Sequence, residues 1–295
     1  MRHLRPAAAA AGSVLLAMAV TGTSAVAPAA GRETVPLADV VTIRPDAVHI
    51  LDSVLNNPPT TAYCEEHYHI ACYLPAQIQQ AYHLPQLYRH GIKGRGQTII
   101  IVDSFGSPTV QRDLARFDKA AGLPAPPSLK VIQPAGKVPP YKPDADREGW
   151  AGETDLDVEY AHTIAPEANI VLVETPTSEN EGTTGFPQIV AAEKYVISHH
   201  LGGVISQSFS ATEQTFASKQ SLLDLRGAYV DAARSGVTVL AASGDSGAAD
   251  VKFNEVTYYL HPVTSWPDSD PLVTGVDGIR LHLSAAGNNL KRPTV

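Results

Sequence analysis

The chain has only two cysteines, no internal repeat and no excess of basic side chains among its 295 residues. Its 30 acidic residues outnumber 22 Lys and Arg, which gives a formal net charge of −8. That balance weighs against nucleic acid and anionic membrane surfaces as partners, because both attract basic surfaces. After the first thirty residues no stretch reaches the roughly 20 apolar residues of a membrane span. What remains is a composition, 44% hydrophobic and 18% charged, that is typical of a globular protein.

The first thirty residues have the pattern of a secretory signal peptide. A basic start, "MRHLRP", precedes a short apolar run and then a region of small residues suited to cleavage. A retained membrane anchor is the alternative, but the apolar run is short for one. We therefore expect residues 1–30 to be removed, and the protein to be secreted, with no membrane contact after cleavage. Residues 31–72, rich in proline and without periodicity, predict a linker or short pro-segment.

The two cysteines, Cys64 and Cys72, lie close together in sequence. Export to an oxidising compartment favours a disulfide that closes a small loop. The alternative is metal ligation together with His67 and His69, but zinc sites usually place their ligand pairs apart. The disulfide is the preferred prediction, and no metal site is expected.

Strands and helices alternate along the rest of the chain. Apolar runs predict strands, and segments of helical spacing lie between them. The predicted strands are 97–104, 169–175, 203–209 and 237–243, and the predicted helices are 109–123, 153–165, 186–200 and 219–236. Residues 139–152 are polar and predict a long surface loop. The order predicts an α/β fold: a mostly parallel sheet with helices on both faces.

Polar residues follow the predicted strands at the edge where parallel sheets gather functional groups. Asp103 ends the first strand, Ser206 and Ser208 end a later one, and Asp245 follows the last.

Glu153 and Asp157 lie four residues apart in a predicted helix, with Cβ atoms expected roughly 5–6 Å apart on one face. Such a pair, when partly buried, shares a proton and can remove one from a hydroxyl nucleophile, as His and Asp do in a serine triad. The alternative is that both acids only favour the first turn of the helix, where its dipole is positive.

Ser246 lies in a Gly-Asp-Ser-Gly tetrad, residues 244–247, like that around the nucleophile of trypsin-like proteases. Those enzymes are antiparallel barrels, whereas this chain has the strand–helix order of a parallel sheet. The architecture therefore disfavours Ser246 as a trypsin-type nucleophile. His162, in the helix after Asp157, is expected to be a residue of the helix face and not a triad histidine.

Four segments occur together in an order that resembles the sedolisin family of serine-carboxyl peptidases. They are "GETDLDVEYAHTIAPEANIVLVE", "GVISQSFS", "VTVLAASGDSGAAD" and "SWPDSDPLVTGVDGIRL". The resemblance implies a subtilisin-like peptidase domain over 73–295 that hydrolyses peptide bonds at acidic pH. It implies that Glu153 is the general base, Asp157 orients it and Asp245 stabilises the oxyanion. It also implies that Asp103 extends the carboxylate network and that Ser206 and Ser208 lie where the substrate backbone binds.

The sequence also departs from the family pattern. The family's nucleophile lies in a Gly-Thr-Ser motif after the Asp245 segment, and the only such motif here is residues 22–24. The resemblance implies that the nucleophile, the rest of the sheet and the family's calcium site would lie beyond Val295. Asp277 and Ile279 replace the usual Gly and Thr, and Phe209 replaces a frequent Trp. We expect a monomeric chain that is inactive and poorly soluble by itself. The alternatives are a catalytically dead protein that binds peptides and a hydrolase that uses Ser246.

Overall fold

A computed structural model describes residues 58–294, which form one unit with a six-stranded sheet at its centre. The predicted signal peptide and the part of the predicted linker before residue 58 lie outside the described residues. None of the helices formed by residues 58–294 combines the length and apolar composition that crossing a bilayer requires.

The sheet has the strand order β2-β3-β1-β4-β6-β8, and all its strand pairs are parallel. Its strands are β1 (Thr98–Ser104), β2 (Leu129–Ile132), β3 (Asn169–Thr175), β4 (Val204–Gln207), β6 (Thr238–Ala242) and β8 (Thr274–Val276). Two short strands, β5 (Ala211–Thr212) and β7 (Ser265–Trp266), pair antiparallel beside it. The predicted α/β class with a mostly parallel sheet is confirmed.

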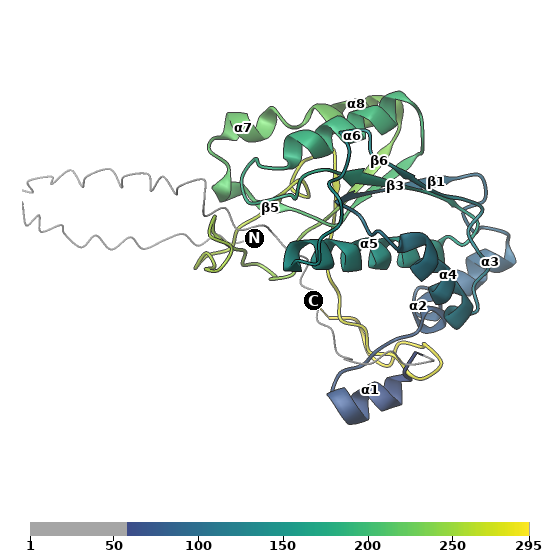
Figure 1. The fold of residues 1–295 in the computed structure, drawn as a ribbon. Coiled ribbons are helices and arrows are strands. Elements are labelled where there is room, and N and C mark those ends of the chain that lie inside the picture. The colour runs from purple at the N-terminus through teal and green to yellow at the C-terminus, as the bar shows by residue number, and fades with distance from the viewer. Residues whose placement is uncertain (1–57, 295) are drawn as a thin grey trace, which may run out of the picture. The chain divides into compact units, whose positions relative to one another are not determined.

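Helices cover both faces of this sheet, as Figure 1 shows. Helices α4 (Val110–Ala121) and α5 (Ala145–Ile164) lie on one face, and α6 (Phe186–Ser198) and α8 (Gly227–Ser235) lie on the other. The remaining helices are α1 (Thr61–Tyr68), α2 (Pro75–Ala81), α3 (Leu84–Arg89), α7 (Lys219–Leu223) and the 3₁₀ turn η2 (Glu213–Thr215).

Alternation along the strands divides the core into two clusters. In β1, Ile101 packs with Val158 of α5 and Leu114 of α4, whereas Ile100 and Val102 pack against α6 and α8. Successive strand residues point to opposite faces, so each buried strand supplies both clusters. Asp103 follows Ile101 by two positions and therefore points toward α5, the helix that carries Glu153 and Asp157.

The long surface loop predicted over 139–152 is shorter than expected. Helix α5 begins at Ala145, where the side chain of Asp144 accepts a hydrogen bond from the Arg147 amide (3.0 Å) and caps the helix. Two glycines in this stretch disfavour helix by about 1 kcal/mol each, which hid the helix from the sequence pattern. Packing of the buried Trp150 against the core offsets that cost.

The helix predicted over 219–236 is also divided, because α7 ends at Leu223 and α8 begins at Gly227. Gly227, the first residue of α8, is a weak helix former, in keeping with the break between α7 and α8.

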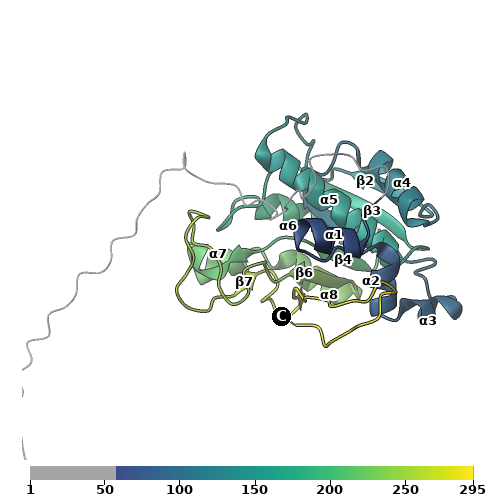
Figure 2. The same cartoon turned by 90° about the horizontal axis from the view of Figure 1, so that it is seen from below.

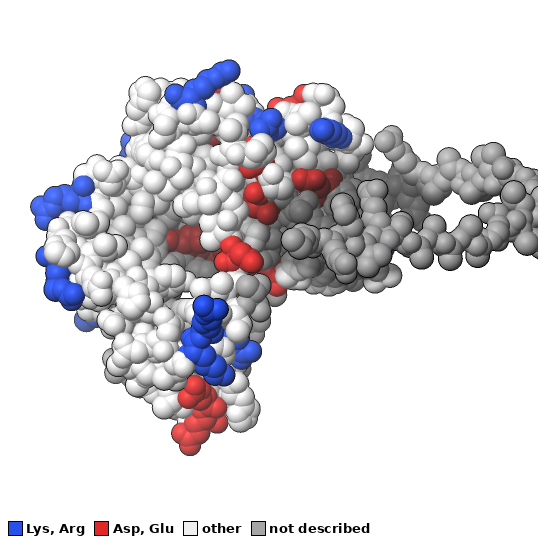
Figure 3. Space-filling model, turned by 180° about the vertical axis from the view of Figure 1, so that it is seen from behind, with Lys and Arg blue, Asp and Glu red and all other residues white. Residues whose placement is uncertain are grey.

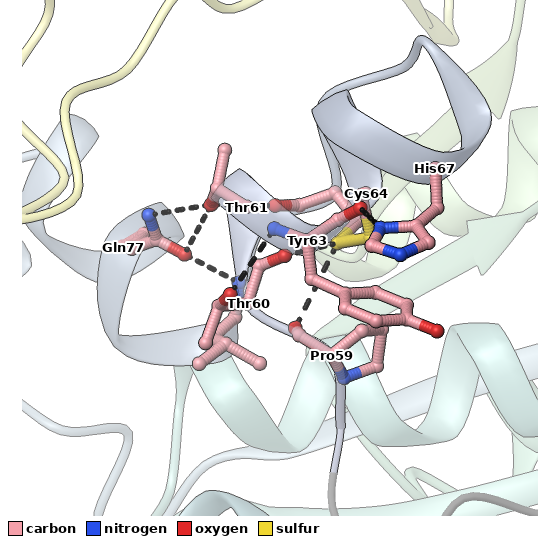
Figure 4. The surroundings of a disulfide bond; sticks show 9 residues. Pro59, Thr60, Thr61, Tyr63, Cys64, His67 and Gln77 are labelled. Carbon is pink, nitrogen blue, oxygen red and sulfur yellow. Dashed lines mark hydrogen bonds between the residues drawn. A yellow bond between two sulfur atoms is a disulfide. The ribbon is translucent and has the colours of Figure 1, made fainter.

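The N-terminal part of the described chain is joined by a disulfide between Cys64 and Cys72 (Figure 4). The Cα atoms of the two residues are 5.9 Å apart, and the bond ties helix α1 to the segment before α2. Helix α1 forms within the stretch predicted as linker or short pro-segment. Its residue Thr61 exchanges hydrogen bonds with the side chain of Gln77 in α2, so α1 has a defined contact with the domain.

The last described residues run beside α2 (Figure 2). The hydroxyl of Tyr73 donates to the carbonyl of Leu281 (3.1 Å), and Gln77 donates to the carbonyl of Ser284 (3.3 Å). Segments more than 200 residues apart in sequence therefore pack together at this end of the domain.

Candidate functional site

Glu153 and Asp157 lie in the middle of helix α5, one turn apart. Glu153 is eight positions beyond Ala145, the first helical residue, which is about 12 Å at 1.5 Å per residue. The field of the helix dipole fades within the first turn. The alternative that these acids only favour the N-terminal turn is therefore wrong, because other acids, Asp146 and Glu148, occupy that turn.

The two carboxyl groups share one polar environment with the end of β4 and the loop after β6. The pKa of Glu153 is raised to about 7, chiefly by burial and also by the charges of Asp157 and Asp245, and a hydrogen bond from Ser208 opposes this rise. Burial also raises the pKa of Asp157 to about 6, and Ser208 again opposes the rise. The Ser208 hydroxyl can thus donate to either carboxylate, and the negative charge of Asp245 reaches Glu153.

Asp103, near the end of β1, extends this group into the core. It is fully buried, and neither of its oxygens has a hydrogen bond of normal geometry within residues 58–294. Burial holds its pKa well above the usual range, and the charge of Asp157 adds to the rise; the nearby hydroxyl of Thr154 partly opposes it. Removing a carboxylate from water without a compensating partner is costly, so burial favours the protonated form of Asp103.

Asp245 lies in the exposed loop that follows β6. Gly244 and Gly247 flank it with φ of 94° and 64°, the left-handed region that glycine adopts without strain. The loop can therefore turn sharply and present Asp245 at the carboxyl edge of the sheet. The other residue of interest here, Ser246, is half-buried, and none of the hydrogen bonds within residues 58–294 joins its hydroxyl to a His or a carboxylate.

The structure places Ser206 and Ser208 differently. Ser206 is paired inside the sheet, between Ile101 of β1 and Leu240 of β6, and shares their orientation toward α5. Ser208 lies beyond the end of β4, beside the carboxyl pair. No described contact within residues 58–294 links the Ser206 side chain to the acids, so only Ser208 belongs to the carboxylate group.

His162 lies outside this group. Its ring is fully buried, with Nε2 2.6 Å from the carbonyl oxygen of Pro124 and 3.3 Å from Oδ1 of Asp118. These contacts fix α5 against α4 and the chain after it, so His162 is a packing residue of the helix face, as predicted.

The two tryptophans also have structural surroundings. Trp150 is buried and donates its ring N–H to Ser178 (3.1 Å), and Trp266 packs edge-on against Phe186 with ring centroids 5.1 Å apart. Phe209, in the position where relatives often have Trp, packs edge-on against Phe186 as well. It is buried in the apolar cluster and has no N–H to donate to the acids.

Two further residues that sequence patterns did not indicate, Thr154 and Glu174, also lie beside the site carboxylates. Thr154 follows Glu153 in α5 and is fully buried beside Asp103. Glu174 is the register partner of Asp103 across β1 and β3, and its charge also raises the pKa of Asp103. Correct alignment of the two predicted strands would have brought Glu174 to Asp103; nothing in the sequence marked Thr154.

Metal ligation finds no support in the part of the chain that the structure describes. No group of three or more His, Cys, Asp and Glu side chains there has the arrangement to hold an ion. The sulfurs of Cys64 and Cys72 are bonded to each other, which excludes the alternative of a metal site with His67 and His69.

Comparisons with known proteins bear on the fold and on the kind of protein that this chain resembles. No protein-family model matches the chain. Kumamolisin from Bacillus sp. (strain MN-32) is 31% identical over 223 residues, which is 76% of this chain and 37% of that protein. The chain thus spans about a third of the curated relative that it matches.

Among solved structures, Pseudomonas sedolisin, a serine-carboxyl proteinase complexed with two molecules of pseudo-iodotyrostatin, matches with a TM-score of 0.61. The identity is 22%, and the match covers 76% of this chain and 58% of the sedolisin chain. At that identity the structural likeness shows the shared fold alone.

Proposed function

Because the chain is a homologue of the sedolisin family of serine-carboxyl peptidases and has its subtilisin-like fold, we propose that it carries the acid–base part of a peptidase site. The substrate is a peptide or protein, bound in extended form along the end of β4. The observation that supports this best is the convergence of Glu153, Asp157 and Asp245 with Ser208 at the carboxyl edge of the sheet.

In this proposal Glu153 is the general base and Asp157 orients it. A serine hydroxyl transfers its proton to the Glu153 carboxylate as its oxygen attacks the carbonyl carbon of the scissile bond. The carbonyl oxygen becomes an oxyanion, and a protonated Asp245 donates a hydrogen bond to it. Glu153 then gives the proton to the leaving amine, which leaves an acyl-serine ester. Water hydrolyses the ester by the same steps, with Glu153 first accepting and then returning a proton.

The protonation states favour an acidic working pH. Asp245 must carry a proton to donate, and Glu153 must lose one to act as a base. A pKa of about 7 keeps most Glu153 protonated in acid. A serine hydroxyl that donates to Glu153 would lower that pKa, as Ser208 already does, and would increase the ionised fraction in the assembled site.

The nucleophilic serine of the proposed mechanism is not identified among residues 1–295. The family's Gly-Thr-Ser motif does not occur in residues 246–295. We propose that residues 1–295 alone do not turn over peptides, and that no calcium ion is held by residues 58–294, where no suitable ligand group occurs. Secretion after loss of residues 1–30 is supported by the Cys64–Cys72 disulfide, which is typical of oxidising compartments.

A second candidate is a protein that binds peptides without cleaving them. One experiment separates these functions from each other and from a hydrolase that uses Ser246. The purified chain and its S246A variant are incubated with a fluorogenic peptide from acidic to neutral pH, and peptide binding is followed by fluorescence anisotropy. We expect binding without turnover in both.

Turnover by the wild type that S246A abolishes would replace the proposal with Ser246 chemistry. Turnover that survives S246A but is lost in E153Q would show that another serine of the chain is the nucleophile and that Glu153 is its general base. Absence of peptide binding in all variants would contradict both the peptidase and the binding function.

A further inference from the structure

A hollow of about 380 Å³ lies beside the loop that carries Asp245. One wall is that loop and its continuation, and the other is the segment around β7. It is lined by Ser243, Gly247, Ala248, Ala249, Asp250, Val263, Thr264, Ser265, Asp268 and Asp277. Its volume lies within the range of small-ligand pockets, roughly 300–1,000 Å³. The hollow is therefore large enough for one long side chain of a bound peptide.

The charged residues of the lining are all acidic. Asp250, Asp268 and Asp277 contribute three carboxyl groups, and none of the ion pairs within residues 58–294 involves them. The nearest basic residue in sequence, Lys252, holds its ammonium over the ring of Tyr259, 5.8 Å from the centroid, and does not line the hollow. Figure 3 shows that acidic side chains gather near the middle of one face of the molecule, while most Lys and Arg lie toward its edges.

A second acidic layer lies near Asp250, formed by Glu179 and Glu181. Glu179 is fully buried, and neither of its carboxyl oxygens has a hydrogen-bond partner within residues 58–294. Burial raises its pKa well above the usual range, and the charges of Glu181, Glu255 and Asp250 raise it further. A buried carboxyl group that has no hydrogen-bond partner and lies near other acids is unfavourable. A nearby positive charge or a bound proton would stabilise it.

The neighbouring Glu181, by contrast, has hydrogen-bond partners for its carboxylate. It accepts hydrogen bonds from the amide of Thr212 (3.0 Å) and from the hydroxyl of Thr215 (2.7 Å). No Lys, Arg or His takes part in these bonds, so the layer brings hydrogen bonds but no compensating charge.

Asp250 is a half-buried acid of the hollow that hydrogen bonds hold in place, whereas Asp277, which also accepts hydrogen bonds, is exposed. The hydroxyl of Ser265 donates to Oδ2 of Asp250, and the amide of Val251 donates to its Oδ1 (2.7 Å). Each oxygen keeps further acceptor capacity, because an ionised carboxylate has about four lone-pair sites. A cation that enters the hollow would meet an oriented carboxylate and would not have to order it first.

We propose that this hollow binds the cationic side chain of a Lys or Arg in the peptide, with Asp250 as the partner of its ammonium or guanidinium group. The proposal rests on the proposed function, because it names the class of peptide that this site selects. Asp268 and Asp277 add negative potential to the same hollow and favour entry of a cation over an acidic or apolar side chain.

Binding of matched peptides tests this directly, without any need for turnover. Two acetylated fluorescent peptides differ only in one central residue, Lys in one and norleucine in the other, and a third has norleucine and a free amino terminus. We expect the wild type to bind the Lys peptide about tenfold more tightly than the acetylated norleucine peptide. D250N should remove that preference, whereas D224N, at the exposed end of α7, should retain it.

Each other outcome has a defined meaning. Equal affinity of the wild type for Lys and norleucine peptides would overturn the proposal and leave the peptide-binding function intact. Equal affinity for the Lys peptide and the third peptide would assign the hollow to a terminal amine and overturn the side-chain assignment. Failure to bind any of the three peptides would contradict the proposed function as well. The wild-type comparison decides the question even where D250N does not fold, which circular dichroism would show.

Discussion

Glu153 and Asp157 lie one helical turn apart in the interior of α5, and the hydroxyl of Ser208 from the end of β4 opposes the rise in pKa of both carboxyls. Two half-buried carboxyls so placed cannot both ionise easily, so the first proton to leave belongs to the pair. This coupling makes the titration of either carboxyl depend on the charge of the other. The raised pKa values of these buried carboxyls also make the stability of the fold depend on pH.

The stability of the protein is expected to fall as pH rises from about 5 to about 8. Burial raises the pKa of Glu153 to about 7, of Asp157 and Asp155 to about 6, and of Glu159 and Glu181 to about 8. A carboxyl whose folded pKa exceeds its unfolded value stabilises the fold below the unfolded pKa, and that stability is lost as pH rises through the folded pKa. Urea denaturation across this range measures it, and a midpoint that rises with pH would contradict it.

Replacement of Asp103 by Asn should flatten part of that pH dependence. The amide has nearly the same shape but no charge, so D103N should unfold at higher urea than the wild type at pH 8 and at similar urea in acid. D224N, at an exposed position, is the matched control and should leave the profile unchanged.

The S208A variant is expected to raise the pKa of both Glu153 and Asp157, because the hydroxyl that favours their ionised forms is removed. S210A, two residues further along the chain, is the control. Carboxyl-selective NMR titration of the two variants makes the comparison. A shift in Glu153 alone would show that Ser208 serves only one member of the pair.

Removal of the disulfide in a C64A/C72A double variant should destabilise the protein by about 2–3 kcal/mol, the loop-closure contribution of a short loop. Loss of the hydrogen bonds between Thr61 and Gln77 should accompany it, since the bond fixes α1 beside α2. Urea denaturation gives the free energy, and amide hydrogen exchange of α1 locates the change. An unchanged midpoint with fast exchange confined to α1 would show that this helix unfolds separately from the domain.

Sequence patterns predicted the parts of the fold in which burial alternates regularly. The apolar run at 97–104 forms β1, and the helix predicted over 109–123 forms α4, which ends before Gly122 with its φ of 69°. Asp103 lies beside Glu153 and Asp157 because strand alternation points it to the face of the sheet that α5 covers. These features could be predicted because the alternation of apolar residues and the order of strands and helices are visible in the sequence itself.

The remainder depended on tertiary contacts that no local pattern shows. Residues 145–152 form helix despite their glycines because Trp150 packs into the core. The strand β8 is short and exposed, so it lacks the apolar run by which strands are found. The segment with Glu179 and Glu181 has no periodicity at all, and its burial follows only from contacts with residues such as Thr212 and Thr215.

Titration of the Glu153 carboxyl tests the central claim, that Glu153, Asp157 and Asp245 form one coupled site. Carboxyl NMR of the wild type should give a pKa near 7 for Glu153, and D157N and D245N should each lower it, while D224N should not. A Glu153 pKa near the ordinary value of about 4.3, unchanged in D157N and D245N, would contradict the account.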